Sequence, residues 1–170
     1  MPGSLFKIKL IKDLSGAFLA IIAAFILHTL FSRISISYVL VFNIMNLVVL
    51  YFAVRKGERF GAGIGTVCGL IQDSFSSGVF GIGGLSKTLM GYGAGYISRK
   101  INVYPLSRNF VFLLVMLTSE LIIWGLLYSF AFTENVNTGG GLIFFQPLGT
   151  GILGSLIFQV MRKFQVNFSH

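Results

Sequence analysis

The chain alternates long apolar runs with short polar segments. Leu14 to Phe31, for example, contains no aspartate, glutamate, lysine or arginine, and about 20 residues of this kind, with a lower limit near 17, let a helix cross a membrane. Comparable runs continue along the sequence, and two of them are rich in glycine. The pattern predicts an all-α polytopic membrane protein, a single domain over residues 1–170, with six transmembrane helices at about 14–31, 36–54, 60–81, 84–98, 110–132 and 142–161.

Composition adds to this picture by excluding alternatives. The chain is 55% hydrophobic and 11% charged, and its mean hydropathy is +0.85. A soluble domain has about a quarter of its residues charged, and a disordered chain has low hydrophobicity. The sequence therefore excludes both classes.

The basic residues predict the orientation. Cytoplasmic loops of membrane proteins carry an excess of lysine and arginine. The net charge of +8 comes in small groups between apolar runs, so we expect no nucleic-acid partner, which would require a basic face. With six spans, most basic residues fall on one side, and we predict that this side is cytoplasmic and holds both termini. These residues are Lys7, Lys9, Lys12, Arg55, Lys56, Arg59, Arg99, Lys100, Arg108, Arg162 and Lys163.

Two glycine-rich runs place small residues four positions apart, so that they form one stripe on a helix. The first stripe leads to Asp73, and the second begins at Lys87 and ends at Arg99. Helices with nearly bare faces approach closely in lipid, and we predict a packing seam between the third and fourth spans. Its members are Gly61, Gly65 and Gly69 before Asp73, and Gly91 and Gly95 after Lys87.

The two charged residues of the seam, Asp73 and Lys87, fall at similar depth. At about 1.5 Å per residue, Asp73 lies ~21 Å from Arg59 and Lys87 lies ~18 Å from Arg99, the residues that mark the cytoplasmic surface. One such charge near the centre of a bilayer costs about 2.5–3.5 kcal/mol. We therefore expect an ion pair between Asp73 and Lys87.

The connection between these spans, Ser74 to Ser86, is rich in glycine and serine. Irregular backbone at membrane depth needs protein or water to satisfy its polar groups. We expect a broken or bent end of the third span, buried against the other helices.

Glu120 is another charged residue inside a predicted span, and two interpretations stay open. It is either a functional group, as proton relay or substrate contact, or an acid that is neutral or hydrogen-bonded and holds the bundle together. No second acid or histidine lies at helical spacing from it, which favours the second interpretation. His28, toward the outer end of the first span, is expected at the membrane interface rather than in catalysis.

No motif predicts an enzyme or a cofactor. The chain has no Gly-x-x-x-x-Gly-Lys-Ser/Thr loop and no His-Glu-x-x-His. Its two histidines, His28 and His170, are too far apart in sequence to suggest a metal site. Cys68 is the one cysteine of the chain, so no internal disulfide is expected. We predict no catalytic, cofactor-binding or metal-binding residues.

One stretch carries a more specific pattern. It begins with Arg55-Lys56-Gly57, passes through the glycine stripe into Gly69-Leu70-Ile71-Gln72-Asp73, and continues to Ser77-Gly78, Gly81 and Lys87-Thr88-x-x-x-Tyr92. In these residues, which cover about a quarter of the chain, the sequence resembles the rod shape-determining membrane protein family MreD.

The resemblance implies a non-catalytic scaffold of the cell-elongation machinery, the elongasome, in the bacterial inner (cytoplasmic) membrane. It implies direct association with MreC and, through the complex, with the actin-like MreB and with the RodA glycosyltransferase and its penicillin-binding partner. These proteins direct lateral peptidoglycan synthesis and rod shape. The family is also similar in helix arrangement to the substrate-binding subunits of energy-coupling-factor transporters. The glycine stripes and Asp73 are then interpreted as core, which leaves the outer faces for the MreC transmembrane helix.

A small-solute-binding subunit of an energy-coupling-factor type transporter is the alternative, since it would also be small, six-spanning and glycine-rich. Such a subunit needs a pocket with convergent polar groups, and the candidates are Glu120, His28, Gln72 and the stretch from Thr133 to Gly141. The transporter interpretation predicts a co-purified ligand. The scaffold interpretation predicts co-purified proteins and no small-molecule substrate.

Overall fold

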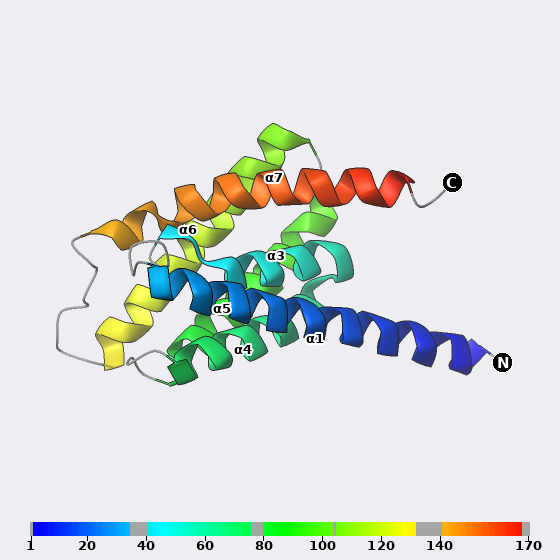
Figure 1. Ribbon diagram of the computed structural model, residues 1–170, viewed down its shortest axis with the longest axis horizontal. Coiled ribbons are helices and arrows are strands. Elements are labelled where there is room, and N and C mark those ends of the chain that lie inside the picture. The colour runs from blue at the N-terminus through cyan, green and yellow to red at the C-terminus, as the bar shows by residue number, and fades with distance from the viewer. Residues whose placement is uncertain (1, 35–40, 76–79, 104, 132–140, 168–170) are drawn as a thin grey trace.

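The computed structural model describes residues 2–34, 41–75, 80–103, 105–131 and 141–167, and every regular element within them is a helix. The predicted all-α class is confirmed. The helices, shown in Figure 1, are α1 (Pro2–Ile34), α3 (Ile44–Lys56), α4 (Glu58–Phe75), α5 (Ile82–Lys100), α6 (Leu106–Ala131), the short 3₁₀ helix η1 (Leu142–Phe145) and α7 (Gln146–Asn167).

Three stretches of the described helices are long and apolar enough to cross a membrane. They are Ile11–Ile34 in α1, Leu106–Ala131, which is α6, and Ile143–Met161, which covers most of η1 and much of α7. The helices α3, α4 and α5 have 13, 18 and 19 residues, and each of them buries polar or charged side chains. The number of six crossings stays a prediction.

The third predicted span is too long, because α4 ends at Phe75 rather than near residue 81. Before α5 the chain passes through Gly81 with φ of +102°, a left-handed conformation that suits glycine. Phe75 and Phe80 are 74% and 65% exposed, whereas Gly83, Gly84 and Ser86 are buried. The expected burial of this connection is therefore met at its α5 end and is wrong at Phe75 and Phe80. Residues 76–79 lie outside the described residues, as do residues 36–40 of the predicted second span.

The pair α4 and α5 lies at the centre of the packing. These two helices have the most extensive contact, α3 lies against both of them, α6 packs on α5 and α7, and α1 packs on α3. In Figure 1 the beginning of α1 and the end of α7 lie at the same end of the molecule. The described part of the chain thus begins and ends on one side of the bundle.

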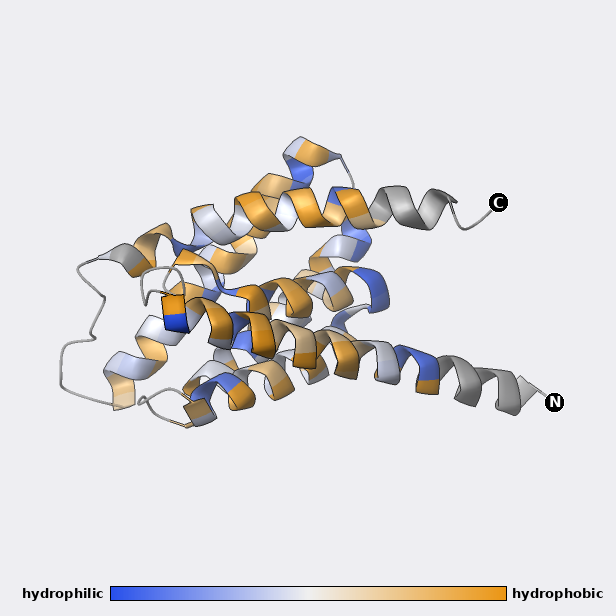
Figure 2. Ribbon diagram, in the orientation of Figure 1, coloured by the Kyte–Doolittle hydropathy of each residue, from blue (hydrophilic) through white to orange (hydrophobic). Residues whose placement is uncertain are grey.

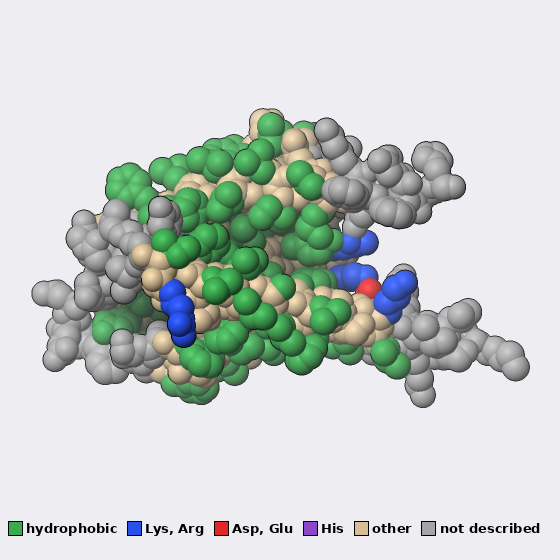
Figure 3. All heavy atoms as spheres, viewed as in Figure 1, with side chains coloured by type: hydrophobic (Ala, Val, Ile, Leu, Met, Phe, Trp, Pro, Cys, Tyr) green, Lys and Arg blue, Asp and Glu red, His purple; other side chains and the backbone are tan. Residues whose placement is uncertain are grey.

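The molecule is apolar both inside and outside. Fully buried side chains fill the space between α3, α5 and α6. Figure 2 shows that hydrophobic residues recur along the helices, and apolar side chains cover much of the face seen in Figure 3. On α1, α6 and η1, Phe18, Phe130 and Phe144 are 64%, 88% and 67% exposed. Extended apolar surface of this kind is unfavourable in water and is satisfied by lipid. The largest fully buried apolar side chains are Met45, Leu50, Met90, Leu113, Leu117 and Val49.

The helix α1 is attached through one narrow stripe. Among its described side chains, those of Ala17, Ile21 and Ala24 are buried. Their spacing of four and three residues places them on one face of the helix. Alanine at two of the three positions lets the α1 backbone approach α3 closely, while the remaining faces of α1 stay open to the surroundings.

Candidate functional site: a buried polar centre

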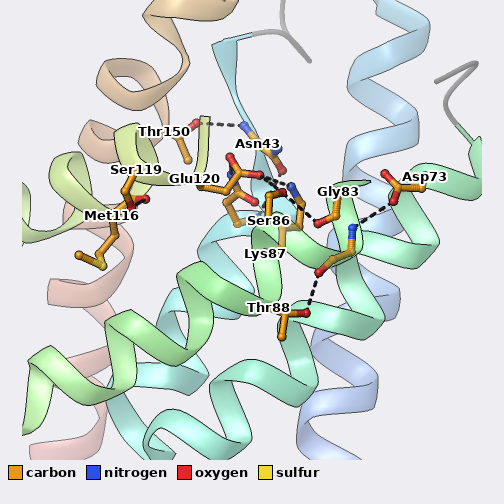
Figure 4. A network of polar contacts seen from close by, with 12 residues as sticks. Asn43, Asp73, Gly83, Ser86, Lys87, Thr88, Met116, Ser119, Glu120 and Thr150 are labelled. Carbon is orange, nitrogen blue, oxygen red and sulfur yellow. Dashed lines mark hydrogen bonds and ion pairs between the residues drawn. The ribbon is translucent and has the colours of Figure 1, made fainter. Parts of the chain in front are cut away.

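An ion pair lies inside the bundle. Lys87 Nζ donates to Glu120 Oε1 at 2.8 Å, and the two side chains are 3% and 4% exposed. Lys87 belongs to the second turn of α5 and Glu120 to the middle of α6, so the pair joins these helices (Figure 4). Either charge alone would be very unfavourable in this apolar interior, because several kcal/mol are lost when an ion is desolvated without a partner.

Two neutral side chains complete what we call the polar centre, which consists of Asn46, Ser86, Lys87 and Glu120. Ser86 Oγ donates to Glu120 Oε1 at 3.3 Å, and Asn46 Nδ2 donates to Glu120 Oε2 at 3.2 Å. Both neutral residues are fully buried. Each oxygen of the Glu120 carboxylate therefore has a donor from the protein, and the centre connects α3, α5 and α6.

The polar contacts continue to α7 through Asn43 and Thr150. Asn43 Oδ1 accepts from the backbone N–H of Asn46, which caps the first turn of α3. The backbone N–H of Asn43 donates to Thr150 Oγ1 at 3.0 Å, and the Thr150 hydroxyl donates to the carbonyl of Val41 at 3.1 Å. Figure 4 shows Thr150 and Asn43 facing each other beside Glu120. One connected set of hydrogen bonds thus links four helices.

Asp73 has a different role from the one predicted. Its Oδ2 accepts the backbone N–H of Gly81 at 2.9 Å and that of Gly84 at 3.0 Å. These N–H groups belong to the start of α5, where the first turn of any helix lacks internal acceptors and favours negative charge. Asp73 near the end of α4 therefore caps the next helix and fixes the reversal between them.

The expected ion pair of Asp73 with Lys87 is wrong, because the acid that binds Lys87 is Glu120. The distances of Asp73 and Lys87 from the predicted cytoplasmic surface indicate similar depth in the membrane. They do not give the directions in which the two side chains point. In Figure 4 the Asp73 carboxylate points to the backbone near Gly83, on the far side of α5 from Glu120. The close contact with Gly83 leaves no space there for a Cβ atom.

The glycine stripes of α4 and α5 face each other. A Cβ added at Gly61 would come within 3.0 Å of the Gly91 carbonyl, one at Gly65 would overlap the Lys87 carbonyl, and one at Gly69 would overlap the Gly83 carbonyl. Gly95 meets the backbone of Glu58 in the same way. These contacts bring the two backbones together, as small residues do between helices in lipid. The seam holds α5 in the position from which Lys87 reaches Glu120.

The other residues proposed for a solute site are not joined to the polar centre. Within the described residues, His28 Nδ1 and Gln72 Oε1 are buried and have no hydrogen-bond partner. His28 is partly buried, and its position at the membrane interface stays a prediction. Of the stretch from Thr133 to Gly141, residues 133–140 lie outside the described residues. The described part of the chain contains no group of three or more His, Cys, Asp or Glu that could hold a metal ion.

Sequence reasoning missed the neutral members of the site, Asn43, Asn46, Ser86 and Thr150. Their signal is weak, because a single asparagine or threonine in an apolar run is compatible with many environments. Asn43 and Asn46 do follow one another at helical spacing in an otherwise apolar stretch. That spacing was a usable indication of a buried polar face on α3.

These features define an α-helical membrane protein whose central helices are packed through glycine and held by a buried charged centre. The comparison with protein families identifies the particular group. The model of the family "rod shape-determining protein MreD" matches residues 8–166, and the chain belongs to this family. No curated protein and no solved structure matches the chain, so the expected similarity to the substrate-binding subunits of energy-coupling-factor transporters stays a prediction.

Proposed function

We propose that the chain is a non-catalytic scaffold of the cell-elongation machinery in the bacterial inner membrane. It binds MreC directly, and through the complex it associates with MreB and with RodA and its penicillin-binding partner. In this way it helps organise lateral peptidoglycan synthesis and rod shape. The observation that carries the proposal is the family match over residues 8–166.

The state of the polar centre supports a scaffold over a solute-binding subunit. Both carboxylate oxygens of Glu120 accept hydrogen bonds from the protein, and the charge of Lys87 is compensated by Glu120. A solute site needs polar groups that are left to converge on a ligand. In this chain the charged groups of the interior instead hold α3, α5 and α6 together, so that Lys87, Glu120, Asp73 and the glycine seam are structural.

The apolar outer surface supports binding to other membrane helices. Exposed apolar side chains run along α1, α6 and α7, and these described apolar faces are available to lipid or to a transmembrane helix such as that of MreC. Because interactions between helices in lipid depend on close packing, the partner needs shape complementarity more than hydrophobicity.

The proposal includes six membrane crossings with both termini in the cytoplasm. The start of α1 and the end of α7 lie at the same end of the molecule, which supports this orientation. The basic residues in the segments at that end support it as well. A reporter enzyme fused after Lys163 tests the orientation. Activity only in the cytoplasm is expected, and activity only outside the cell would contradict the topology.

The function is tested by mild-detergent affinity purification of the tagged chain from its own bacterium, followed by mass spectrometry of the proteins and small molecules recovered. MreC is expected, together with RodA or its penicillin-binding partner. A variant with Gly65 and Gly69 replaced by leucine serves as the control for folding-dependent recovery, since both side chains would overlap α5. Recovery of a small solute with an energising ATPase, and no MreC, would identify a transporter subunit and reject the scaffold.

A further inference from the structure

We propose that the end of the molecule where α3 joins α4 and where α5 ends binds the phosphate headgroups of anionic phospholipids. The basic residues of this end surface are Arg55, Lys56, Arg59, Arg99 and Lys100. The inference goes beyond the proposed function. It requires the chain to lie in a bilayer, but it does not depend on MreC or any other protein.

The turn at Gly57 brings the two basic segments together. Gly57 has φ of +94°, and the Arg99 guanidinium occupies the space where a Cβ would lie. Arg99 Nη2 also pairs with Glu58 Oε2 at 2.8 Å, and Gly95 contacts the Glu58 backbone. Residues 55–59 and 99–100 therefore form one surface. Figure 3 shows lysine and arginine side chains gathered at this end of the molecule, with an acidic side chain visible beside them.

The end surface keeps an excess of positive charge after its internal ion pairs are counted. Arg99 is paired with Glu58, and Lys56 Nζ is paired with Asp13 at 2.6 Å. Lys100 Nζ instead donates to the neutral Tyr96 hydroxyl at 2.7 Å. Within the described residues, Arg59 is exposed and has no acidic partner. Charge complementarity thus points to an anionic ligand.

Tyrosine side chains hold two of the cations at the boundary of the apolar surface. Lys100 Nζ lies 4.4 Å from the centroid of the Tyr96 ring, and Tyr96 is 48% exposed. On α3 the Arg55 guanidinium lies 5.8 Å from the Tyr51 ring centroid and donates to its hydroxyl. Tyrosine rings occupy the headgroup level of a membrane. The adjoining cations are therefore held at the depth of lipid phosphates, which favours a lipid over a soluble anion.

The test uses the full-length chain purified in detergent, without partners. Native mass spectrometry counts the lipid molecules retained when phosphatidylglycerol or phosphatidylcholine is added at equal concentration. Each basic residue near an anionic surface strengthens binding about fivefold. The double variant Arg59→Gln/Lys100→Gln is therefore expected to bind phosphatidylglycerol about 25-fold more weakly than the parent chain.

Arg33→Gln is the matched control, because Arg33 is an exposed cation in the last turn of α1, away from the end surface. It is expected to leave phosphatidylglycerol binding unchanged, and both variants should retain the thermal midpoint of the parent. Equal retention of both lipids by the parent chain would overturn the proposal, as would equal losses in the double variant and in Arg33→Gln. Displacement of phosphatidylglycerol by an equal concentration of inorganic phosphate would also overturn it, since the ligand would then be a free anion.

Discussion

Lys87 and Glu120 are separated by 33 residues in the sequence and by 2.8 Å between Nζ and Oε1 in the bundle. The pair connects α5, which packs against α4 through the glycine seam, with α6. Because both groups are almost completely buried, neither can exchange its partner for water. The relative position of α5 and α6 is therefore held by this ion pair together with the Ser86 hydroxyl, which donates to the same carboxylate.

Removal of one partner of this pair should be much more harmful than removal of both. Lys87→Met leaves the Glu120 carboxylate buried without its cation, and we expect the free energy of unfolding to fall by about 3–5 kcal/mol. Lys87→Met/Glu120→Leu should lose less, because no buried charge remains. Denaturant unfolding in detergent measures both. A double variant that loses the full sum of the two single losses would show that the residues do not act as a pair.

The seam should respond to substitution on one face of α4 only. Gly65→Ala would bring a Cβ into the Lys87 carbonyl, and we expect a loss of about 1–3 kcal/mol from overpacking. Gly63→Ala is the control, since nothing lies within 4 Å of the added Cβ. It should be neutral or stabilising by up to about 1 kcal/mol, as alanine favours helix. Thermal unfolding measures the stability of both variants. Equal losses of stability would contradict a seam at Gly65.

The cap formed by Asp73 predicts a graded effect. Asp73→Ala removes the acceptor of the Gly81 and Gly84 N–H groups and should cost about 0.5–2 kcal/mol. Asp73→Asn keeps a side-chain oxygen and should cost less. Amide hydrogen exchange at Gly84 should quicken in the alanine variant more than in the asparagine variant. Unchanged exchange in both would remove the capping role.

The contact between α7 and the start of α3 depends on one hydroxyl. Thr150→Val leaves the Asn43 N–H and the Val41 carbonyl without the partner they now share, and we expect a loss of about 1–3 kcal/mol in stability. Thr29→Val is the control, because the exposed Thr29 hydroxyl donates to the Phe25 carbonyl of its own helix. Similar unfolding midpoints for the two variants would contradict the role of Thr150.

Local features of this fold follow from the sequence, and contacts between distant segments do not. The four-residue spacing of Gly61, Gly65 and Gly69 defines one face of α4 because helix geometry is local, and in the structure this face meets α5. Hydropathy did not locate the end of α4 at Phe75, because no charged residue follows it before Lys87, although the serines and glycines after Phe75 are typical of a connection between helices.

The partner of Lys87 depends on which helices are neighbours. Asp73 and Glu120 are both acids in apolar runs, and depth alone does not distinguish them. Lys87 pairs with Glu120 because α6 packs on α5. The Asp73 carboxylate instead accepts the backbone N–H groups at the start of α5. Asn46 and Thr150 were missed for a related reason, because a neutral polar side chain costs much less to bury than an ion and so stands out less in an apolar sequence.

The polar centre is made from residues that leave the ribosome in a fixed order. Asn46 and Lys87 are synthesised before Glu120, so α5 is complete while the acid that compensates its ammonium group does not yet exist. An unpaired lysine in lipid is costly, and the acid that compensates the charge of Lys87 in the bundle comes 33 residues later in the chain. The order of the sequence therefore places the cation of the polar centre in the growing protein before its anion.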